Sequence, residues 1–242
     1  MSNIKWSGYE WLPREVWGQY HPDKTYCYYD PTAIEINNNE LILKTQLNPK
    51  KFKGKSLHYN SELDELEIPV GVGLVSCTEK FEYGYFEVEA KLPQGKHLWP
   101  AFWMSPNQSW PPEIDVFEGY TKNKNNYFHF NLKNPFGFWR VETNFHCGKQ
   151  PNNYNLGAKT HWLGFNSPSK NYNKFGCLWS EDRIEIYYND RLVRKLTDAK
   201  LLAEYREKTM NVKINNHVDK NIDIINPTQS EYKIKYFKYE KL

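Results

Sequence analysis

PPEIDVFEGY, residues 111–120, places three acidic residues, Glu113, Asp115 and Glu118, among the β-branched and aromatic side chains that a buried strand prefers. Side chains alternate between the two faces of a strand, so Glu113 and Asp115 share one face. In a regular strand, Glu118 points to the opposite face. Either the acids are divided between two faces, or the strand contains an irregularity.

A β-bulge would resolve this conflict. One extra residue at Val116 or Phe117 returns Glu118 to the face of Glu113 and Asp115, and bulges are known to re-aim side chains next to active sites. Three acids on one face repel one another unless they share protons or bind a cation. Such a cluster is therefore more often functional than structural.

The length and composition are those of one globular domain. The chain has 242 residues, enough to bury a sizeable core, and no break in composition marks a linker, so we expect a single domain over residues 1–242. No apolar run is long enough to span a membrane. The net charge of +3 is too small to indicate a nucleic-acid partner, and we expect the Lys-rich stretch 44–55 to be a solvated loop.

The cysteines and histidines form no recognisable metal motif. CxxC spacing is absent, and His146 and His161 fit no ordered set of ligands, so we expect no metal site and buried free thiols. Residues 1–11 lack the apolar segment of a secretory signal, so either a signal has been removed or the chain has none. The cysteines are Cys27, Cys77, Cys147 and Cys177.

Alternation of apolar and polar residues predicts several strands. FEVEAKL, residues 86–92, has an apolar residue at every second position, Phe86, Val88, Ala90 and Leu92, on one face and charged residues on the other. Residues 183–196 are typical of two strands joined by a tight hairpin at Asn189-Asp190. The segment 231–239 alternates again and is expected to close a sheet.

Helical periodicity is nearly absent. Residues 197–208 are the one segment that predicts a short helix. Clusters of Gly and Pro, among them residues 48–54 and 134–137, predict loops between short strands. The fold class that follows is all-β, with two packed antiparallel sheets.

The acidic row suggests glycoside chemistry. A retaining glycosidase needs two carboxylates about 5 to 5.5 Å apart, one to attack the anomeric carbon and one to protonate the leaving oxygen. Glu113 and Glu118 are the candidates, with Asp115 between them. Trp99 and Trp103 share a parity and Trp110 directly precedes the acids, so aromatic rings are expected beside the carboxylates, although each Trp is also a good core residue.

Several segments together resemble glycoside hydrolase family 16. They are residues 71–104, GVGLVSCTEKFEYGYFEVEAKLPQGKHLWPAFWM, followed by PPEIDVFE at 111–118. The family signature is ExDxE or, in its bulged branch, ExDxxE, and this sequence has the bulged form. The resemblance continues through the hairpin at 179–193 and the strand at 232–239, and so covers roughly residues 15 to 240.

This resemblance implies a β-jelly-roll sandwich with a concave substrate cleft, and endo-acting, retaining cleavage of β-linked polysaccharide. Matched residue by residue, Glu113 takes the position of the nucleophile, Asp115 that of the assisting acid and Glu118 that of the acid/base. It implies no cofactor; a structural calcium ion would be compatible with the fold, but no motif indicates one.

Residues flanking the acids also match the family in part. Trp99 and Trp103 match its cleft tryptophans, and His129 lies near its histidine after the motif. Pro112 stands where many bulged β-1,3-glucanases have Gly, and Tyr85 replaces the commoner Arg. These departures do not affect the three acids, but they leave open which polysaccharide is the substrate.

The resulting hypothesis is an endo-β-1,3- or 1,3(1,4)-glucanase. The alternatives are a hydrolase of red-algal galactans, such as an agarase, porphyranase or carrageenase, and a non-catalytic glucan-binding protein on the same fold. We expect a monomer whose partner is a polysaccharide, with no nucleic acid or membrane involved. The family resemblance implies a secreted or periplasmic location, although the chain carries no signal peptide.

Overall fold

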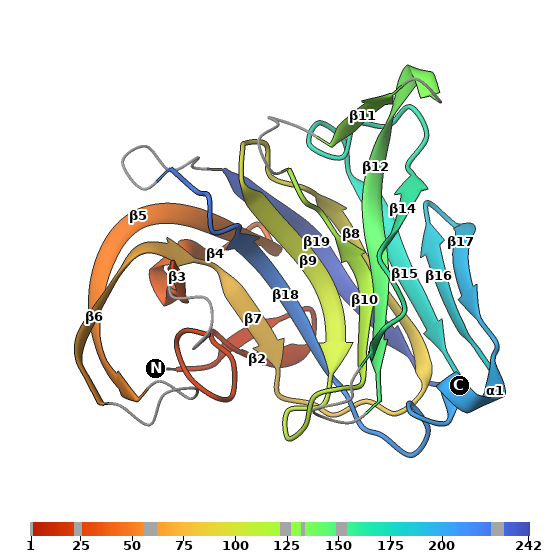
Figure 1. Cartoon of the computed structure of the whole chain (residues 1–242), viewed down its shortest axis with the longest axis horizontal. Helices are drawn as coiled ribbons and strands as arrows, with labels where there is room; N and C mark the ends of the chain where they lie inside the picture. The colour runs from red at the N-terminus through yellow and green to blue at the C-terminus, as the bar shows by residue number, and fades with distance from the viewer. Residues whose placement is uncertain are drawn as a thin grey trace.

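The computed structural model is an all-β sandwich of two large sheets (Figure 1). It describes residues 2–21, 26–55, 62–121, 127–131, 134–148, 154–223 and 230–242; for residues 53–55, 62–65, 129–131, 134–138 and 154 it describes the backbone alone. All strand pairs are antiparallel except β3 with β6, within the described residues. The predicted fold class is confirmed.

The first sheet has ten strands, in the order β1-β2-β7-β18-β9-β10-β12-β11, with β13 and β14 also paired to β12. Their bounds are β1 Ile4–Trp6, β2 Tyr9–Leu12, β7 Leu74–Cys77, β18 Asn211–Val218, β9 Leu98–Ser105, β10 Glu113–Glu118, β12 Asn134–Cys147, β11 Phe128–Asn131, β13 Tyr154–Asn155 and β14 Lys159–Trp162. The acidic stretch therefore lies in the interior of this sheet, between β9 and β12.

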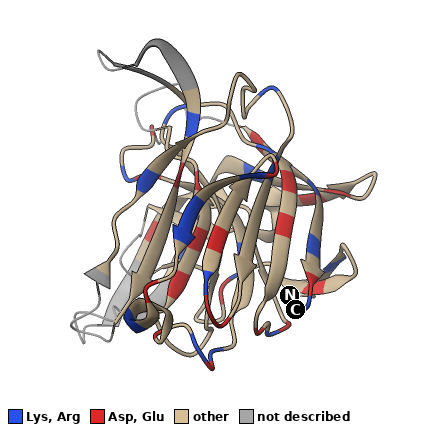
Figure 2. Ribbon diagram, turned by 90° about the vertical axis from the view of Figure 1, so that its right-hand side faces the viewer, with Lys and Arg blue, Asp and Glu red and all other residues tan. Residues whose placement is uncertain are grey.

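The second sheet has nine strands, in the order β17-β16-β15-β8-β19-β5-β6-β3, with β4 paired to β5. Their bounds are β17 Arg191–Leu196, β16 Ile184–Tyr188, β15 Asn173–Trp179, β8 Gly84–Lys91, β19 Glu231–Glu240, β5 Glu40–Lys55, β6 Glu62–Val72, β3 Cys27–Tyr29 and β4 Ile34–Asn37. Its long strands β5 and β6 curl around one end of the molecule (Figure 1). Acidic and basic residues lie on adjoining strands of the opposite flank (Figure 2).

The core lies between the two sheets. In β8, Phe86, Val88 and Ala90 are fully buried, as their alternation with charged residues predicts. From the first sheet, Phe117 packs its ring 4.2 Å from the ring of Phe175, measured between centroids. These contacts fix the back of β10, so its other face is held in a defined position.

The predicted hairpin is confirmed and the predicted helix is much shorter than expected. Asn189 and Asp190 adopt positive φ angles of 49° and 63° between β16 and β17. The helix α1 covers only Ala199–Leu202, and the Asp198 carboxylate caps its first turn. Turns follow up to Glu207, whose φ of 53° lies in the left-handed region that a helix does not contain.

Two stretches that were predicted to be loops are strands in the structure. The Lys-rich stretch 44–55 lies in β5, and residues 134–137 begin β12. The pairing of β5 with β6 shifts between Leu47 and Lys50, an irregularity that accommodates Pro49 in a strand. The four cysteines are buried free thiols, as expected, and within the described part of the chain no helix is long and apolar enough to cross a membrane.

Candidate active site

Strand β10 contains the bulge that its acids required. Asp115 pairs with Trp103 of β9 and Phe117 pairs with Phe102, so Val116 is the extra residue between two consecutive pairs. On its other edge the pairing with β12 shifts at the same place. The predicted irregularity is therefore confirmed, and Val116 is its position.

The bulge places the apolar side chains of β10 on the core face and its acidic side chains on the opposite face. Val116 and Phe117 are both fully buried in the core, although they are neighbours in sequence. As a result Glu118 returns to the face that carries Glu113 and Asp115. Glu113 and Glu118 are half-buried and Asp115 is 4% exposed, so the three acids form one row on the side of the first sheet that faces away from the core.

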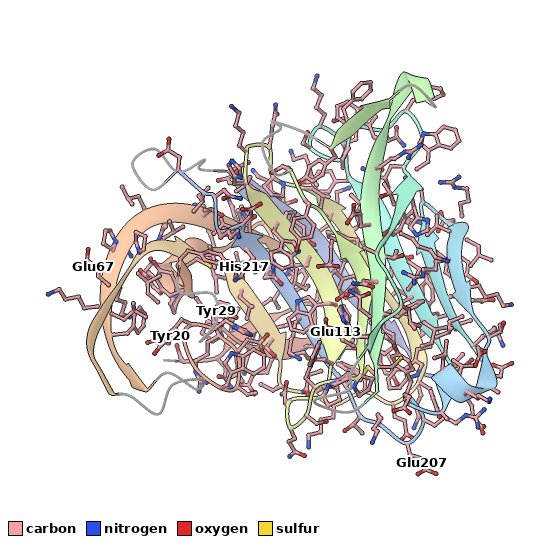
Figure 3. All side chains as sticks on the ribbon, viewed as in Figure 1. Tyr20, Tyr29, Glu67, Glu113, Glu207 and His217 are labelled. Carbon is pink, nitrogen blue, oxygen red and sulfur yellow. The ribbon has the colours of Figure 1, made fainter. Side chains whose placement is uncertain are left out.

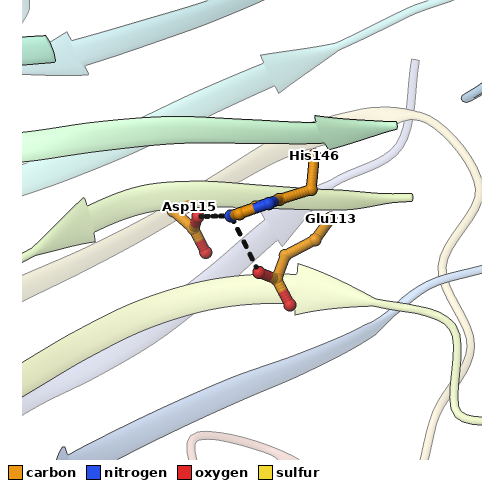
Figure 4. A group of neighbouring side chains, drawn as sticks. All are labelled: Glu113, Asp115 and His146. Carbon is orange, nitrogen blue, oxygen red and sulfur yellow. Dashed lines mark ion pairs between the residues drawn. The ribbon is translucent and has the colours of Figure 1, made fainter. Parts of the chain in front are cut away.

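A histidine lies directly beside this row (Figure 4). His146 of β12 is the register partner of Glu113, and its Nε2 atom lies 3.4 Å from Glu113 Oε1 and 3.4 Å from Asp115 Oδ2. Three possible ligand atoms thus lie within 4.8 Å of one another. The same Nε2 atom lies 3.1 Å from the Asn144 side-chain amide nitrogen, so this imidazole nitrogen connects the two carboxylates with the polar side chain that precedes it on β12.

His146 was not among the site residues predicted from the sequence. Its spacing from the other histidines and cysteines fits no ligand pattern, so no metal site was predicted there. A usable signal was present: polar Asn144 and His146 alternate with Phe145 and Cys147, which are both buried in the core. This alternation puts His146 on the same side of the sheet as the acids.

Burial and neighbouring charges raise the pKa of Glu113 well above its usual value. Burial is the largest cause, followed by repulsion from Asp115; Glu118 adds to the increase. His146 and Lys213 act in the opposite direction, because positive charge favours the ionised carboxylate. The protonation state of Glu113 therefore depends first on its burial and then on two neighbouring acids and two neighbouring bases.

Two tryptophans hold the glutamates at the ends of the row. The indole N–H of Trp110 donates to Glu113 Oε2 at 3.1 Å, and that of Trp99 donates to Glu118 Oε1 at 3.0 Å. The ring of Trp99 is also stacked on Tyr120, with centroids 4.4 Å apart. Each glutamate thus has one fixed donor, which restrains the rotamer of a long side chain.

Trp103 of β9 is the register partner of Asp115, and residues of β18 on its other side contact its ring. Its indole N–H donates to Asn215 Oδ1 at 2.7 Å, and the ammonium of Lys213 lies 4.6 Å from its ring centroid. No residue of β18 was predicted from the sequence to belong to the site. Farther along this strand, His217 lies toward the curled end of the molecule, as does Tyr29, while Glu113 lies nearer the centre (Figure 3).

The remaining candidate, His129, lies in β11, where it pairs with Phe138 of β12. Its side chain lies outside the described residues, so its place in a substrate site stays a prediction. The structure brings together the other candidates from the sequence, namely Glu113, Asp115, Glu118, Trp99, Trp103 and Trp110. It adds His146, Lys213 and Asn215.

Known proteins are similar to this chain in sequence and in fold. Among curated proteins, an endo-1,3-1,4-beta-glycanase of Rhizobium meliloti is 32% identical over 114 residues, which are 47% of this chain and 21% of the relative. The first relatives found are matched over 21% to 43% of their own length, so the chain spans less than half of each.

Solved structures share the fold at low sequence identity. The LamAcat structure from Zobellia galactanivorans has a TM-score of 0.68 at 17% identity, covering 96% of this chain and 90% of that one. A Bacteroides ovatus structure from a mixed linkage glucan locus, in complex with a G4G4G3G product, has a TM-score of 0.67 at 20% identity, covering 92% and 93%. The sequence matches the profile of "Glycosyl hydrolases family 16" over residues 22–238, and the chain belongs to this family.

Proposed function

We propose that this chain is a retaining endo-glycosidase that cleaves β-1,3- or mixed β-1,3-1,4-glucan. The observation that carries the proposal is the bulge at Val116, which places Glu113 and Glu118 on one face with Asp115 between them. Each glutamate has its own indole donor. Two carboxylates held on one face in this way suit a double-displacement reaction.

In the proposed reaction, Glu113 attacks the anomeric carbon while Glu118 protonates the departing glycosidic oxygen. The bond from carbon to that oxygen breaks, and a covalent glycosyl-enzyme forms on Glu113. Glu118, now ionised, then removes a proton from water, which displaces Glu113 and restores both residues. The product keeps the β configuration of the substrate.

Asp115 and His146 would control the charge of the nucleophile. A protonated His146 favours ionised Glu113, which is the form that attacks. Asp115 lies at the same distance from His146 Nε2, and its negative charge acts in the opposite direction, toward protonated Glu113. We assign both residues to holding the proton balance at Glu113, and we propose that no cofactor takes part.

The choice of glucan follows the relatives, which include an endo-1,3-1,4-beta-glycanase and a structure from a mixed linkage glucan locus with a bound product. A panel of purified polysaccharides tests it: laminarin, mixed-linkage β-glucan, agar, porphyran and carrageenan, with products separated by size. Short oligosaccharides of several lengths from laminarin or mixed-linkage glucan are expected. Cleavage of a galactan alone would overturn the substrate, and binding without cleavage of any polymer would overturn the enzymatic function.

The roles of the two glutamates have their own test. Proton NMR of the first product is expected to show the β anomer before mutarotation. A Glu118→Ala variant supplied with azide and a substrate with a good leaving group is expected to yield a β-glycosyl azide, because azide fills the space of the missing base. An α anomer as first product would contradict both assignments.

A further inference from the structure

His217 of β18 lies on the same face of the first sheet as the acidic row. It is the register partner of Trp99 in β9, and directly paired residues of neighbouring strands point to the same face. Trp99 in turn donates to the candidate acid/base Glu118. His217 is 8% exposed. The proposed reaction gives this buried histidine no role.

Two contacts fix the orientation of the His217 ring. Its Nδ1 atom lies 2.9 Å from the Val218 carbonyl oxygen, so this nitrogen carries a hydrogen and donates it. Cys27 Sγ lies 3.2 Å from Nε2 and 3.7 Å from Nδ1, distances that place the sulfur beside the ring and not in line with either nitrogen. A sulfur against an aromatic ring is a favourable contact. The imidazole is therefore held both by its own strand and by β3 of the second sheet.

The held imidazole borders the ring of Trp99. The two ring centroids are 5.6 Å apart and the ring planes are inclined at 76°, which is an edge-to-face contact. Tyr120 stacks on the same indole, with centroids 4.4 Å apart and planes inclined at 28°. The indole N–H donates to Glu118 Oε1 at 3.0 Å. Two rings thus confine Trp99, so its N–H points at Glu118 in a fixed direction.

Cys27 connects this arrangement to the curled end of the molecule. It belongs to a second, smaller hydrophobic cluster, which also includes Tyr29 and packs against Tyr26. Both tyrosine rings border the imidazole of His217, with centroids 6.1 Å away for Tyr26 and 6.5 Å away for Tyr29. Strand β3 pairs with β6, one of the two long strands of the curl. The packing of this end therefore reaches His217 directly.

We propose that His217 is a positioning residue, which together with Tyr120 clamps the Trp99 ring and so keeps the carboxyl group of Glu118 in place for proton transfer. Cys27 supports His217 from the second sheet. The inference rests on the proposed function in taking Glu118 as the acid/base. It extends that function to two residues, His217 and Cys27, that do not touch the reacting atoms.

A pair of substrates with different leaving groups tests this role. Transfer of the sugar to Glu113 needs a proton from Glu118 when a sugar hydroxyl departs, but hardly any when a dinitrophenolate departs. The measured quantity is kcat/KM for a β-glucan oligosaccharide and for its dinitrophenyl β-glycoside, because kcat/KM does not include the later hydrolysis of the glycosyl-enzyme. His217→Ala is expected to lower it about ten-fold for the oligosaccharide and less than about two-fold for the activated glycoside, since a displaced acid weakens only proton transfer.

Three further variants separate positioning from general loosening. His217→Phe keeps a ring against Trp99 and is expected to lose less activity on the oligosaccharide than His217→Ala. Cys27→Ala removes the support of His217 but leaves its ring, so a smaller loss that again spares the activated glycoside is expected. Cys177→Ala, the matched control, removes a buried free thiol from the core of the second sheet and should leave the ratio of the two activities unchanged.

A second measurement needs no substrate. The indole N–H resonance of Trp99, assigned by its loss in a Trp99→Phe variant, reports how firmly this donor is held. His217→Ala is expected to speed the exchange of this hydrogen with solvent several-fold, because local opening becomes easier. Cys177→Ala should leave the exchange rate unchanged.

Equal losses on both substrates in His217→Ala, or no loss on either, would overturn the inference. An unchanged exchange rate of the Trp99 N–H, or an equal loss in His217→Phe and His217→Ala, would do the same. If His217→Ala does not fold, Cys27→Ala decides by the same two measurements. A wild-type protein that cleaves neither substrate, combined with faster exchange of the Trp99 N–H in His217→Ala, would overturn the proposed function and leave the clamp on Trp99 in place.

Discussion

Glu113 in the first sheet and Glu185 in the second are the same residue type in similar surroundings, yet their acidity changes in opposite directions. Both lie in antiparallel strands, and their side chains are 14% and 9% exposed. The pKa of Glu113 is raised by burial and by Asp115. Burial also acts to raise the pKa of Glu185, but hydrogen bonds from Lys195 and Tyr187 outweigh it, so that pKa is lowered.

The difference shows that the partners, and not the depth of burial, decide what a glutamate in this fold can do. Glu185 accepts hydrogen bonds at 2.7 Å from Tyr187 and at 2.8 Å from Lys195 and is satisfied as an ion. Glu113 has an indole donor and a shared imidazole, but two further carboxylates act on it. Donors therefore satisfy the charge of Glu185 in the second sheet, whereas Glu113 in the first sheet belongs to a group of three acids on one face.

The largest expected effect separates the two glutamates by activity. Glu113→Gln is expected to lower kcat by about a thousand-fold or more, because the amide cannot attack the anomeric carbon. Glu185→Gln, the matched control in the second sheet, should leave kcat within about two-fold, since Glu185 lies in the other sheet and its ion-pair and hydrogen-bond partners are not residues of the acidic row. Initial rates on the best polysaccharide measure both. Equal losses would remove the functional distinction between the sheets.

A tryptophan pair extends the comparison to aromatic residues. Trp103 lies half-buried in the first sheet, and Trp179 is fully buried in the core of the second. Trp103→Ala is expected to raise KM for long substrates about ten-fold, the loss of about 1.4 kcal/mol of binding, with a small change in Tm. Trp179→Ala is expected to cost about 3–5 kcal/mol of stability.

Thermal unfolding and kinetics on short and long oligosaccharides check this prediction. Severe destabilisation by Trp103→Ala, with unchanged kinetics per folded molecule, would place Trp103 in the core instead.

Stability against pH should sharpen the contrast between the glutamates. The pKa of folded Glu113 is raised above its usual value of 4.5, so its stabilising contribution is present below that pH and is lost as the pH rises through the folded pKa. Glu113→Gln should therefore raise Tm at pH 7 relative to the wild type, and the gain should disappear at pH 4.

For Glu185 the lowered pKa gives the reverse sign. Its contribution is present above its usual pKa and is lost as the pH falls through the folded value. Glu185→Gln should lower Tm at pH 7 and approach the wild type in more acidic buffer. Calorimetry of the three proteins across this range provides the measurement, and Tm changes of the same sign at pH 7 would refute the comparison.

The smallest expected effect concerns metal. If the imidazole of His146 provides the positive charge near Glu113 and Asp115, dialysis against EDTA should leave kcat/KM unchanged within error. Assays before and after dialysis, with calcium or zinc added back as the control, test this. A loss that an added ion restores would reassign the triad as a cation site.

Much of the fold was accessible from the sequence because period-two alternation and hairpin chemistry are local signals. The strands near 86–92 and 231–239 and the turn at Asn189-Asp190 follow from them. The position of the bulge also followed from an internal conflict, since buried side chains and acids cannot both keep regular alternation in β10. A family resemblance supplied the roles of the acids, which alternation alone does not give.

The parts that were missed depend on contacts between distant segments. His146 reaches Glu113 only because β12 pairs beside β10, and Lys213 reaches the same region from a strand about a hundred residues away in sequence. Pro49 suggested a loop, but the shifted pairing of β5 and β6 accommodates it in a strand. The strand propensity of a segment does not reveal which other strand will pair with it in the folded sheet.

The bulge at Val116 also bears on how the chain selects its strand register while it folds. If the first part of β10 slipped by one residue along β9, Glu113 and Asp115 would turn toward the core and Ile114 toward water. Burying those carboxylates among Phe102 and its neighbours is far more costly than a slip in a purely apolar strand. The residues assigned to chemistry therefore also disfavour misfolded pairings, and replacing them all with amides would make that error less costly.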